Sequence, residues 1–391
     1  MNGAANAPAA LPAGWIVWKL KKAKPGVASV RYRCLMPLLA NEQLYRQSVI
    51  VEGDRGCSLE GVAALIFVKT FYRSDVALAE EAAKRGIPIW FDLCDNIFSA
   101  GYGGNTEAGD AIRAAFIAIA RLATGIVTNG AGLSQVLREN LPADCQGKLV
   151  EQADPIETRE LTARSIAPRS WPNRAVSRAL AGPMKWLTWR YALGLAIKQA
   201  LDGIGVWRRI GHGALPVVLW FGNSSSKGGN EGLGALSECL PQLRAAYARL
   251  PFRLLVVSND LALYRKLIAD RGVPSRYVQW SPLGVFAAMQ RARVCLIPAN
   301  RNNFNRGKSP NRLLMAMAHD LPVIASSIET YQAFADCAVL DDFDQGLSRY
   351  LGDGAARARD LQTFRDRHWP QYQPQRLSED WVARIAAAGR R

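Results

Sequence analysis

Residues 306–312 combine side chains and backbone groups that are suited to binding an anion. Ser309 is a favourable N-cap and Pro310 is favourable at the first helical position, so a helix is predicted to begin near residue 310. The unpaired N–H groups and the positive dipole end of such a helix attract anions. The segment also carries three cations, Arg306, Lys308 and Arg312. We expect it to bind a diphosphate; the alternative is a capped surface helix beside a solvated basic loop.

A second candidate phosphate loop, residues 222–229, follows the apolar run 216–222. Its glycines and serines allow a close approach of the backbone, and Lys227 supplies a positive charge. Loops of this composition are common without a ligand. The assignment therefore depends on the basic segment 306–312.

Two carboxylates, Asp92 and Asp95, follow the apolar run 87–93. At the carboxyl end of a strand, one of them would orient or deprotonate an acceptor hydroxyl. Lys69 ends the run 64–69 and would contact a sugar or a phosphate. The alternatives are a pair of turn-forming carboxylates and a lysine that reaches solvent.

Arg31 and Arg33 follow the lysine-rich loop 21–26 at the start of a predicted helix. They are candidates for binding an anionic acceptor. The alternative is that they form part of a solvated face.

Short apolar runs bounded by turns alternate with helical stretches along the chain, which predicts βα units and parallel sheets. The first half contains the runs 15–20, 48–52, 64–69, 87–93, 125–130 and 148–152, with helical stretches 29–40, 75–85, 110–122 and 131–140. The second half contains the runs 216–222, 252–258, 277–280, 294–298, 322–326 and 338–340. We therefore expect two doubly wound α/β domains.

The net charge of +16 is distributed unevenly. Residues 1–158 have a net charge of zero, whereas residues 159–213 and 214–391 each have a net charge of +8. We therefore divide the chain into an N-terminal domain (1–158), a basic connecting segment (159–213) and a C-terminal domain (214–391). In the last part, the stretch 291–319 holds six cations and no acid, and it is expected to form one basic feature.

The connecting segment 159–213 is rich in tryptophan, with Trp171, Trp186, Trp189 and Trp207. A helix is predicted from about 184 to 201, and its apolar residues point in nearly every direction. Two interpretations stand. A helix that is apolar all round packs against protein, whereas tryptophan mixed with Lys and Arg suits an anionic membrane surface, here through 171–209.

The composition limits the class of protein further. The chain has 391 residues, 49% hydrophobic and 9% aromatic, which is not the composition of a disordered chain. Its seven cysteines form no CxxC pair, so we expect reduced thiols and neither a disulfide framework nor a metal site. No secretory signal or spanning segment is recognisable, and a cytoplasmic protein is expected.

Several segments, in this order, resemble those of GT-B glycosyltransferases of the retaining, family 4-like group. In the second half these are WFGN (220–223), KSPNR (308–312) and PVIAS (322–326). In the first half they are SVRYR (29–33), FDLCDNIF (91–98) and DPIE (154–157), the last resembling the interdomain crossing. Only about 159–213 lies outside the resemblance.

The resemblance implies two Rossmann-like domains facing a cleft, with the acceptor in the N-terminal domain and a nucleotide-sugar donor in the C-terminal domain. The last helix would cross back to the N-terminal domain. In such a fold the candidate catalytic residues, chosen above from their types and positions, are Asp92, Asp95 and Lys69, and the candidate acceptor-binding residues are Arg31 and Arg33. The implied donor-binding residues are Gly222, Asn223, Lys227, Trp280, Arg306, Lys308, Ser309, Asn311, Arg312 and Met315. No metal and no cofactor besides the nucleotide sugar are implied.

The sequence also departs from this family. The family's Glu-x7-Glu pair would fall at Gly307 and Met315, so both carboxylates are missing, and the second of them normally anchors the donor ribose. The N-terminal domain contains no histidine, although many relatives place one near the sugar.

Two functions are therefore weighed. The first is a hexosyltransferase that moves a sugar to a glycan or lipid-linked acceptor in bacterial surface polysaccharide or lipopolysaccharide biosynthesis, either in the cytoplasm or peripherally on the inner face of the plasma membrane. The second is a non-catalytic GT-B-like interaction or regulatory protein. No nucleic-acid-binding motif is recognisable, so nucleic acid is not an expected partner.

Overall fold

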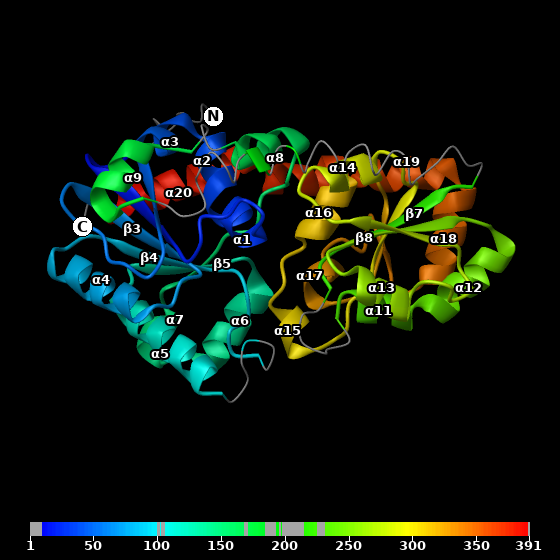
Figure 1. Ribbon diagram of the computed structural model, residues 1–391, viewed down its shortest axis with the longest axis horizontal. Helices are drawn as coiled ribbons and strands as arrows, with labels where there is room; N and C mark the ends of the chain where they lie inside the picture. The colour runs from blue at the N-terminus through cyan, green and yellow to red at the C-terminus, as the bar shows by residue number, and fades with distance from the viewer. Residues whose placement is uncertain are drawn as a thin grey trace, which may run out of the picture. The chain divides into compact units, whose positions relative to one another are not determined.

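The computed structural model describes residues 10–99, 102, 106–167, 171–183, 193–194, 197, 215–224 and 231–389. The chain forms two compact units (Figure 1). The first comprises Met1–Pro155, Arg164–Trp189 and Gln373–Arg391, and the second comprises Ile156–Ala163 and Arg190–Tyr372. The C-terminal residues thus belong to the first unit, and so does part of the segment that we treated as a separate connection.

The first unit is built on a six-stranded parallel sheet with the order β2-β1-β3-β4-β5-β6. Its strands other than the edge strand β6 are almost wholly buried, because helices cover both faces. The strands are β1 (Trp15–Leu20), β2 (Ser48–Glu52), β3 (Val62–Val68), β4 (Ile89–Leu93), β5 (Gly125–Thr128) and β6 (Leu149–Glu151).

Alternate residues of these strands enter two separate cores. Val17 packs with α4 (Arg73–Lys84), α5 (Glu107–Leu122) and α6 (Ala131–Asn140). Trp18 packs with α2 (Met36–Ala40), α3 (Glu42–Gln47) and α20 (Pro374–Ala388), where its ring centroid lies 5.3 Å from that of Trp381. The remaining helices of this unit are α1 (Ala28–Val30), the π-helical turn η1 (Arg31–Leu35), α7 (Ala143–Gln146) and α9 (Arg174–Ala181), whereas α8 (Arg159–Ile166) begins in the second unit and ends in the first.

The second unit also has a six-stranded parallel sheet, with the order β12-β11-β10-β7-β8-β9. Taken in chain order, the first strand lies beside the fourth, which is the Rossmann arrangement 3-2-1-4-5-6. The strands are β7 (Val217–Phe221), β8 (Arg253–Ser258), β9 (Ser275–Gln279), β10 (Val294–Ile297), β11 (Val323–Ala325) and β12 (Val339–Leu340).

Helices cover both faces of this sheet as well (Figure 1). One face packs against α14 (Gly284–Met289), α16 (Asn311–Met317), α17 (Glu329–Gln332), α19 (Gly354–Thr363) and the π-helical turn η4 (Phe364–His368). The other packs against α11 (Leu233–Glu238), α12 (Leu240–Arg249), α13 (Leu261–Leu267) and α18 (Phe343–Gly352). Two short elements complete the unit, α15 (Asn303–Arg306) and the 3-10 turn η5 (Trp369–Tyr372).

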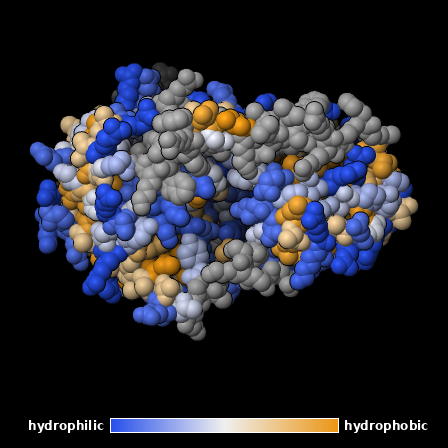
Figure 2. All heavy atoms as spheres, in the orientation of Figure 1, coloured by the Kyte–Doolittle hydropathy of each residue, from blue (hydrophilic) through white to orange (hydrophobic). Residues whose placement is uncertain are grey.

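The predicted doubly wound α/β class is confirmed, and each predicted apolar run contains or overlaps one observed strand. The helical stretch 29–40 differs from the expectation, because it is interrupted by the five-residue π-helical turn η1. None of the described helices is both long enough and apolar enough to cross a membrane. Figure 2 shows hydrophilic residues over much of the visible surface, with apolar residues in small groups.

The tryptophan-rich segment is described only in part. Trp171 is buried in the first unit, where its indole N–H donates to the Ser165 carbonyl at 2.8 Å. Trp186, Trp189 and Trp207 lie outside the described residues, as does most of the predicted helix 184–201.

Candidate functional site

The strand order of the second unit places two loops at one point of the sheet. The chain leaves β7 toward β8 and β10 toward β11, so the loops that follow β7 and β10 diverge at the carboxyl edge. In open α/β sheets, ligands bind at this topological switch point. The loop after β7 begins with Gly222, and the loop after β10 leads through α15 into α16, which contains Arg312.

Arg312 links these two strand ends directly. Its Nη1 donates to the carbonyl of Phe221, the last residue of β7, at 3.3 Å. The same nitrogen would lie 3.0 Å from a Cβ at position 222. Glycine at this position therefore allows the guanidinium group to lie close to the end of β7.

Substitution of Gly222 by alanine tests this close approach. The new methyl group should displace the Arg312 guanidinium and weaken its hydrogen bond, which corresponds to a loss of roughly 0.5–1.5 kcal/mol, or up to about tenfold in affinity for a bound diphosphate. Calorimetric titration with UDP measures the change. Gly147→Ala is the control, since no atom lies within 4 Å of a Cβ at that position. Equal UDP affinity in both variants would show that the close approach of Arg312 to Gly222 has no role in UDP binding.

Lys308 lies in the same loop, between α15 and α16. Its Nζ is 3.9 Å from the centroid of the Phe304 ring, and its carbonyl accepts a hydrogen bond from the Thr330 hydroxyl at 2.7 Å. These contacts order both the backbone and the ammonium group of Lys308. Ser309 is buried at 8% exposure, and the helix begins at Asn311 with Pro310 as its N-cap. The helix start is one residue later than predicted, and no side chain caps it.

The other expected donor residues have different surroundings. Arg306 Nε lies 3.6 Å from the Glu329 carboxylate, which offsets its charge and was not foreseen from the sequence. Asn223 is exposed, and Trp280 is half-buried against the core. Met315 is a core residue with 3% exposure, so its side chain does not replace a ribose-binding carboxylate. Lys227 lies outside the described residues.

The predicted single basic feature at 291–319 is wrong, because β10 runs through it. Arg291 and Arg293 precede Val294 and so lie at the amino edge of the sheet. Arg306, Lys308 and Arg312 follow Ile297 and lie toward the carboxyl edge. At about 3.3 Å per residue, the four residues of β10 keep the two groups on opposite edges.

In the first unit, Arg33 and Asp92 form an internal ion pair rather than an exposed site. Arg33 Nε donates to Asp92 at 2.7 Å, and Arg33 Nη1 donates to the Gln152 carbonyl at 2.7 Å and to Asp154 at 3.0 Å. Arg33 is 2% exposed and Asp92 is 0% exposed. Arg31 is also buried, and it donates to the Pro25 carbonyl at 2.9 Å. These contacts differ from the expected roles in acceptor binding and proton transfer, because the side chains are turned into the domain.

Burial dominates the electrostatics of this cluster. It raises the pKa of Asp92 to about 6, although Arg33 acts in the opposite direction. Burial alone would lower the pKa of Arg33, but Asp92 and Asp154 raise it above the ordinary value. Arg33 Nη2 and Asp92 Oδ2 are buried without a hydrogen-bond partner. The cluster therefore holds η1, β4 and the chain after β6 together at a considerable cost in desolvation.

Lys69 and Asp95 form a second ion pair, and this one is accessible. Their side chains are 23% and 15% exposed, respectively. Burial acts to lower the pKa of Lys69, but Asp95, Cys94 and Tyr102 together outweigh it and raise the pKa, so the ammonium form is retained. Lys69 follows β3 directly and has a left-handed φ of 48°. Such strain in a residue without a glycine's freedom often marks a functional position.

Two further features of the first unit were missed in the sequence. Lys19, inside β1, is fully buried and lies 3.2 Å from the equally buried Asp75 of α4. The side chain of Gln152 donates to the Leu377 carbonyl of α20 at 2.9 Å and accepts from Arg384. The only available signal for Lys19 was its position within the otherwise apolar run WIVWKL.

Among the described residues, one group could hold a metal ion, namely Asp336, Cys337 and His368, whose ligand atoms lie within 4.8 Å of one another. His368 Nε2 and Asp336 Oδ1 are 2.8 Å apart, and the other Asp336 oxygen accepts from Arg367 at 3.2 Å. A surface ion pair accounts for these contacts.

Comparison with known proteins agrees with this geometry. Residues 215–345, which include the Gly222–Arg312 site, match the family described as Glycosyl transferases group 1. No curated protein sequence matches the chain.

Solved structures resemble nearly the whole chain. HepE of Anabaena, solved in complex with UDP and glucose, has a TM-score of 0.61 at 11% identity, over 96% of this chain and 100% of that chain. WaaG, a glycosyltransferase involved in lipopolysaccharide biosynthesis, has a TM-score of 0.56 at 14% identity, over 95% and 99%. The α,α-trehalose 6-phosphate synthase of Burkholderia multivorans has a TM-score of 0.54 at 11% identity, over 96% and 96%.

These matches define the class. The chain has the GT-B fold of glycosyltransferases, and its second unit carries the sequence pattern of glycosyl transferases group 1. The resemblance seen in the sequence is confirmed at this level.

Proposed function

We propose that this protein is a glycosyltransferase that binds the diphosphate of a nucleotide sugar at the carboxyl edge of the second sheet. The observation that carries the proposal is the position of Arg312 against the end of β7 at Gly222, with Lys308 ordered in the same loop. Because HepE was solved with UDP and glucose, a UDP-sugar is the donor to test first.

The chemistry of sugar transfer assigns a role to these cations. As the glycosidic bond to the donor breaks, negative charge builds up on the departing diphosphate. Lys308 and Arg312 would stabilise this charge without a metal ion, since ordered donors aimed at developing charge are the main source of such catalysis. By resemblance, the reaction would retain the configuration of a transferred hexose.

We propose that the Lys69–Asp95 pair binds the acceptor and activates its hydroxyl group. It is the accessible part of the predicted carboxylate and lysine cluster, and it follows neighbouring strands β3 and β4. Lys69 contacts the Asp95 carboxylate, and a carboxylate in this position could accept the proton of an acceptor hydroxyl group. The similarity to WaaG supports a glycan or lipid-linked acceptor in surface polysaccharide or lipopolysaccharide assembly, with the protein in the cytoplasm or on the inner face of the plasma membrane.

A second function is favoured by the residues at the family's two glutamate positions. Gly307 offers no carboxylate, and Met315 is in the core. A non-catalytic GT-B-like protein would tolerate the absence of both carboxylates.

Nucleotide-sugar turnover separates these two functions. A transferase should show a rise in melting temperature with one nucleoside diphosphate, and slow release of that diphosphate from the corresponding nucleotide sugar. Asp95→Asn should reduce the release while leaving the rise in melting temperature intact. A panel of UDP-, GDP- and ADP-sugars with neither effect would support the non-catalytic protein.

A further inference from the structure

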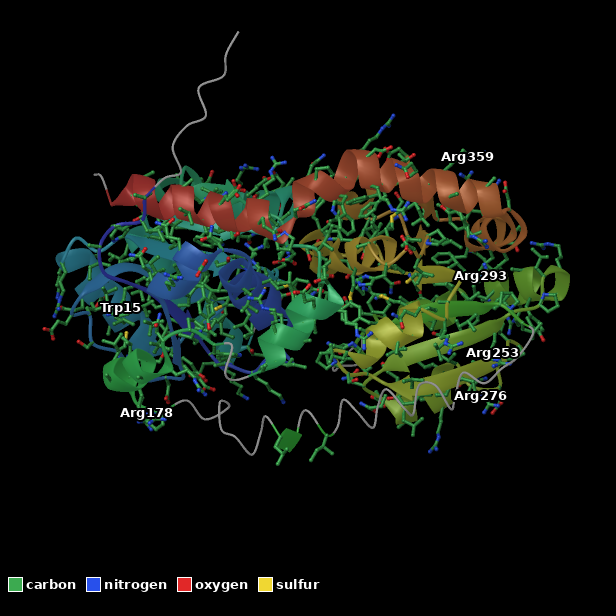
Figure 3. The ribbon with its side chains drawn as sticks, turned by 90° about the horizontal axis from the view of Figure 1, so that it is seen from above. Trp15, Arg178, Arg253, Arg276, Arg293 and Arg359 are labelled. Atoms are coloured by element: carbon green, nitrogen blue, oxygen red, sulfur yellow. The ribbon has the colours of Figure 1, made fainter. Side chains whose placement is uncertain are left out.

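The amino edge of the second sheet carries a row of arginines that the proposed transferase site does not use. Arg253 is the first residue of β8, Arg276 is the second residue of β9, and Arg293 directly precedes β10. Arg276 and Arg293 are exposed and Arg253 is half-buried. Figure 3 shows all three at the same end of the second unit.

The register of the strands places the three side chains on one face of the sheet. Successive side chains of a strand point to opposite faces of the sheet. The residues that follow the three arginines all belong to one core, on the opposite face; they are Leu254, Tyr277 and Val294. Val217 of β7 pairs with Arg253, and its carbonyl accepts from the Arg293 N–H at 2.8 Å. Arg253 and Arg293 therefore stand two strands apart, at roughly 10 Å.

The chain segments that lead into β8, β9 and β10 are basic at this edge, whereas the acids Asp320 and Asp336 precede β11 and β12 and pair with Arg365 and Arg367. The segments 250–253, 271–276 and 290–293 contain five arginines and neither aspartate nor glutamate; the arginines are Arg253, Arg271, Arg276, Arg291 and Arg293. Part of the +8 charge of residues 214–391 is thus concentrated at the amino edge, away from Lys308 and Arg312.

An exposed apolar residue lies among these arginines. Leu215 is 37% exposed, and it precedes Pro216, whose carbonyl accepts from the Arg253 N–H at 2.9 Å. Arginine beside an exposed leucine is the composition of a surface that binds the headgroup region of a membrane.

We propose that the amino edge of the second sheet, formed by Arg253, Arg276, Arg293 and Leu215, docks onto an anionic lipid leaflet. The arginines bind lipid phosphates and Leu215 enters the boundary between headgroups and acyl chains. A nucleic acid would also attract the arginines, but it gives no role to the exposed leucine. The proposal does not depend on the transferase activity, because it uses the opposite edge of the sheet.

Flotation with vesicles tests the proposal. The full chain should float with vesicles of equal parts phosphatidylglycerol and phosphatidylcholine, and remain at the bottom with phosphatidylcholine alone or at high salt. The variant Arg253→Gln/Arg276→Gln/Arg293→Gln should bind roughly a hundredfold more weakly, at roughly fivefold for each arginine. The control is Arg85→Gln/Arg121→Gln/Arg138→Gln, which removes the same charge from exposed positions in the first unit and should bind like the original chain.

Two further measurements keep the outcome unambiguous. If the triple variant has a lower melting temperature, the variant Arg276→Gln/Arg293→Gln, which changes only exposed residues, should still lose at least tenfold in vesicle binding. Equal binding by the triple variant and its control would overturn the proposal, and so would failure of the original chain to float. Binding to a DNA duplex without binding to anionic vesicles would assign the edge to nucleic acid instead.

Discussion

Replacing Arg33 by methionine is expected to lower the free energy of unfolding by about 3–5 kcal/mol at neutral pH. The substitution leaves Asp92 and Asp154 buried without the cation that both contact, at 2.7 and 3.0 Å. The loss would appear as a lower midpoint of urea denaturation, followed by tryptophan fluorescence. Arg85→Met is the control, because Arg85 pairs with Glu81 in solvent and its loss should change the free energy of unfolding by no more than about 0.5 kcal/mol.

The effect of this substitution should also depend on pH. Since the pKa of Asp92 is about 6 in the folded chain, above its ordinary value, Asp92 binds a proton in the folded state before it does in the unfolded state. Asp92 therefore contributes stability as pH falls from 7 to 5. Without Arg33 its pKa rises further, so the Arg33→Met variant should recover part of its loss at pH 5. An equal loss at both pH values would mean that Asp92 is not the uncompensated charge.

Replacing Lys308 and Arg312 together by methionine is expected to weaken donor binding by roughly 10²–10⁴-fold. Each cation supplies a charge-assisted hydrogen bond to phosphate of about 1.5–3 kcal/mol. Isothermal titration with UDP measures the loss directly. Neither residue belongs to the fully buried core, so the melting temperature without ligand should change little.

The matched control is Arg265→Met/Lys266→Met. Both residues are exposed on α13 of the same unit, and the variant loses the same formal charge. Equal losses of UDP affinity in the two double variants would indicate a general field effect of the charged surface. The Lys308 and Arg312 side chains would then have no specific contact with the diphosphate.

The fold could be predicted from the sequence because its strands are buried on both faces. Runs such as IPIWFDL and PVVLWFG are continuous, β-branched or aromatic, and bounded by turns, and each contains a strand, β4 and β7. The order of strands could not be predicted in the same way. It depends on which strands pair, and that pairing is what brings the loops after β7 and β10 to one point.

The candidate site was predicted less completely, since residue type does not reveal which charges are buried. Arg33 and Asp92 are 59 residues apart, and each alone is typical of a surface or a turn. Only their contact explains why both are internal. The basic stretch 291–319 was misjudged for a related reason: it is continuous in the sequence, but β10 divides it between the two edges of the sheet.

The most direct test of the proposed donor site is a crystal structure of the protein with UDP. The diphosphate oxygens should lie within about 3 Å of the Arg312 guanidinium and the Lys308 ammonium, at the ends of β7 and β10. A diphosphate bound instead at Arg253 and Arg293, or no bound UDP at a concentration that saturates a titration, would contradict the account.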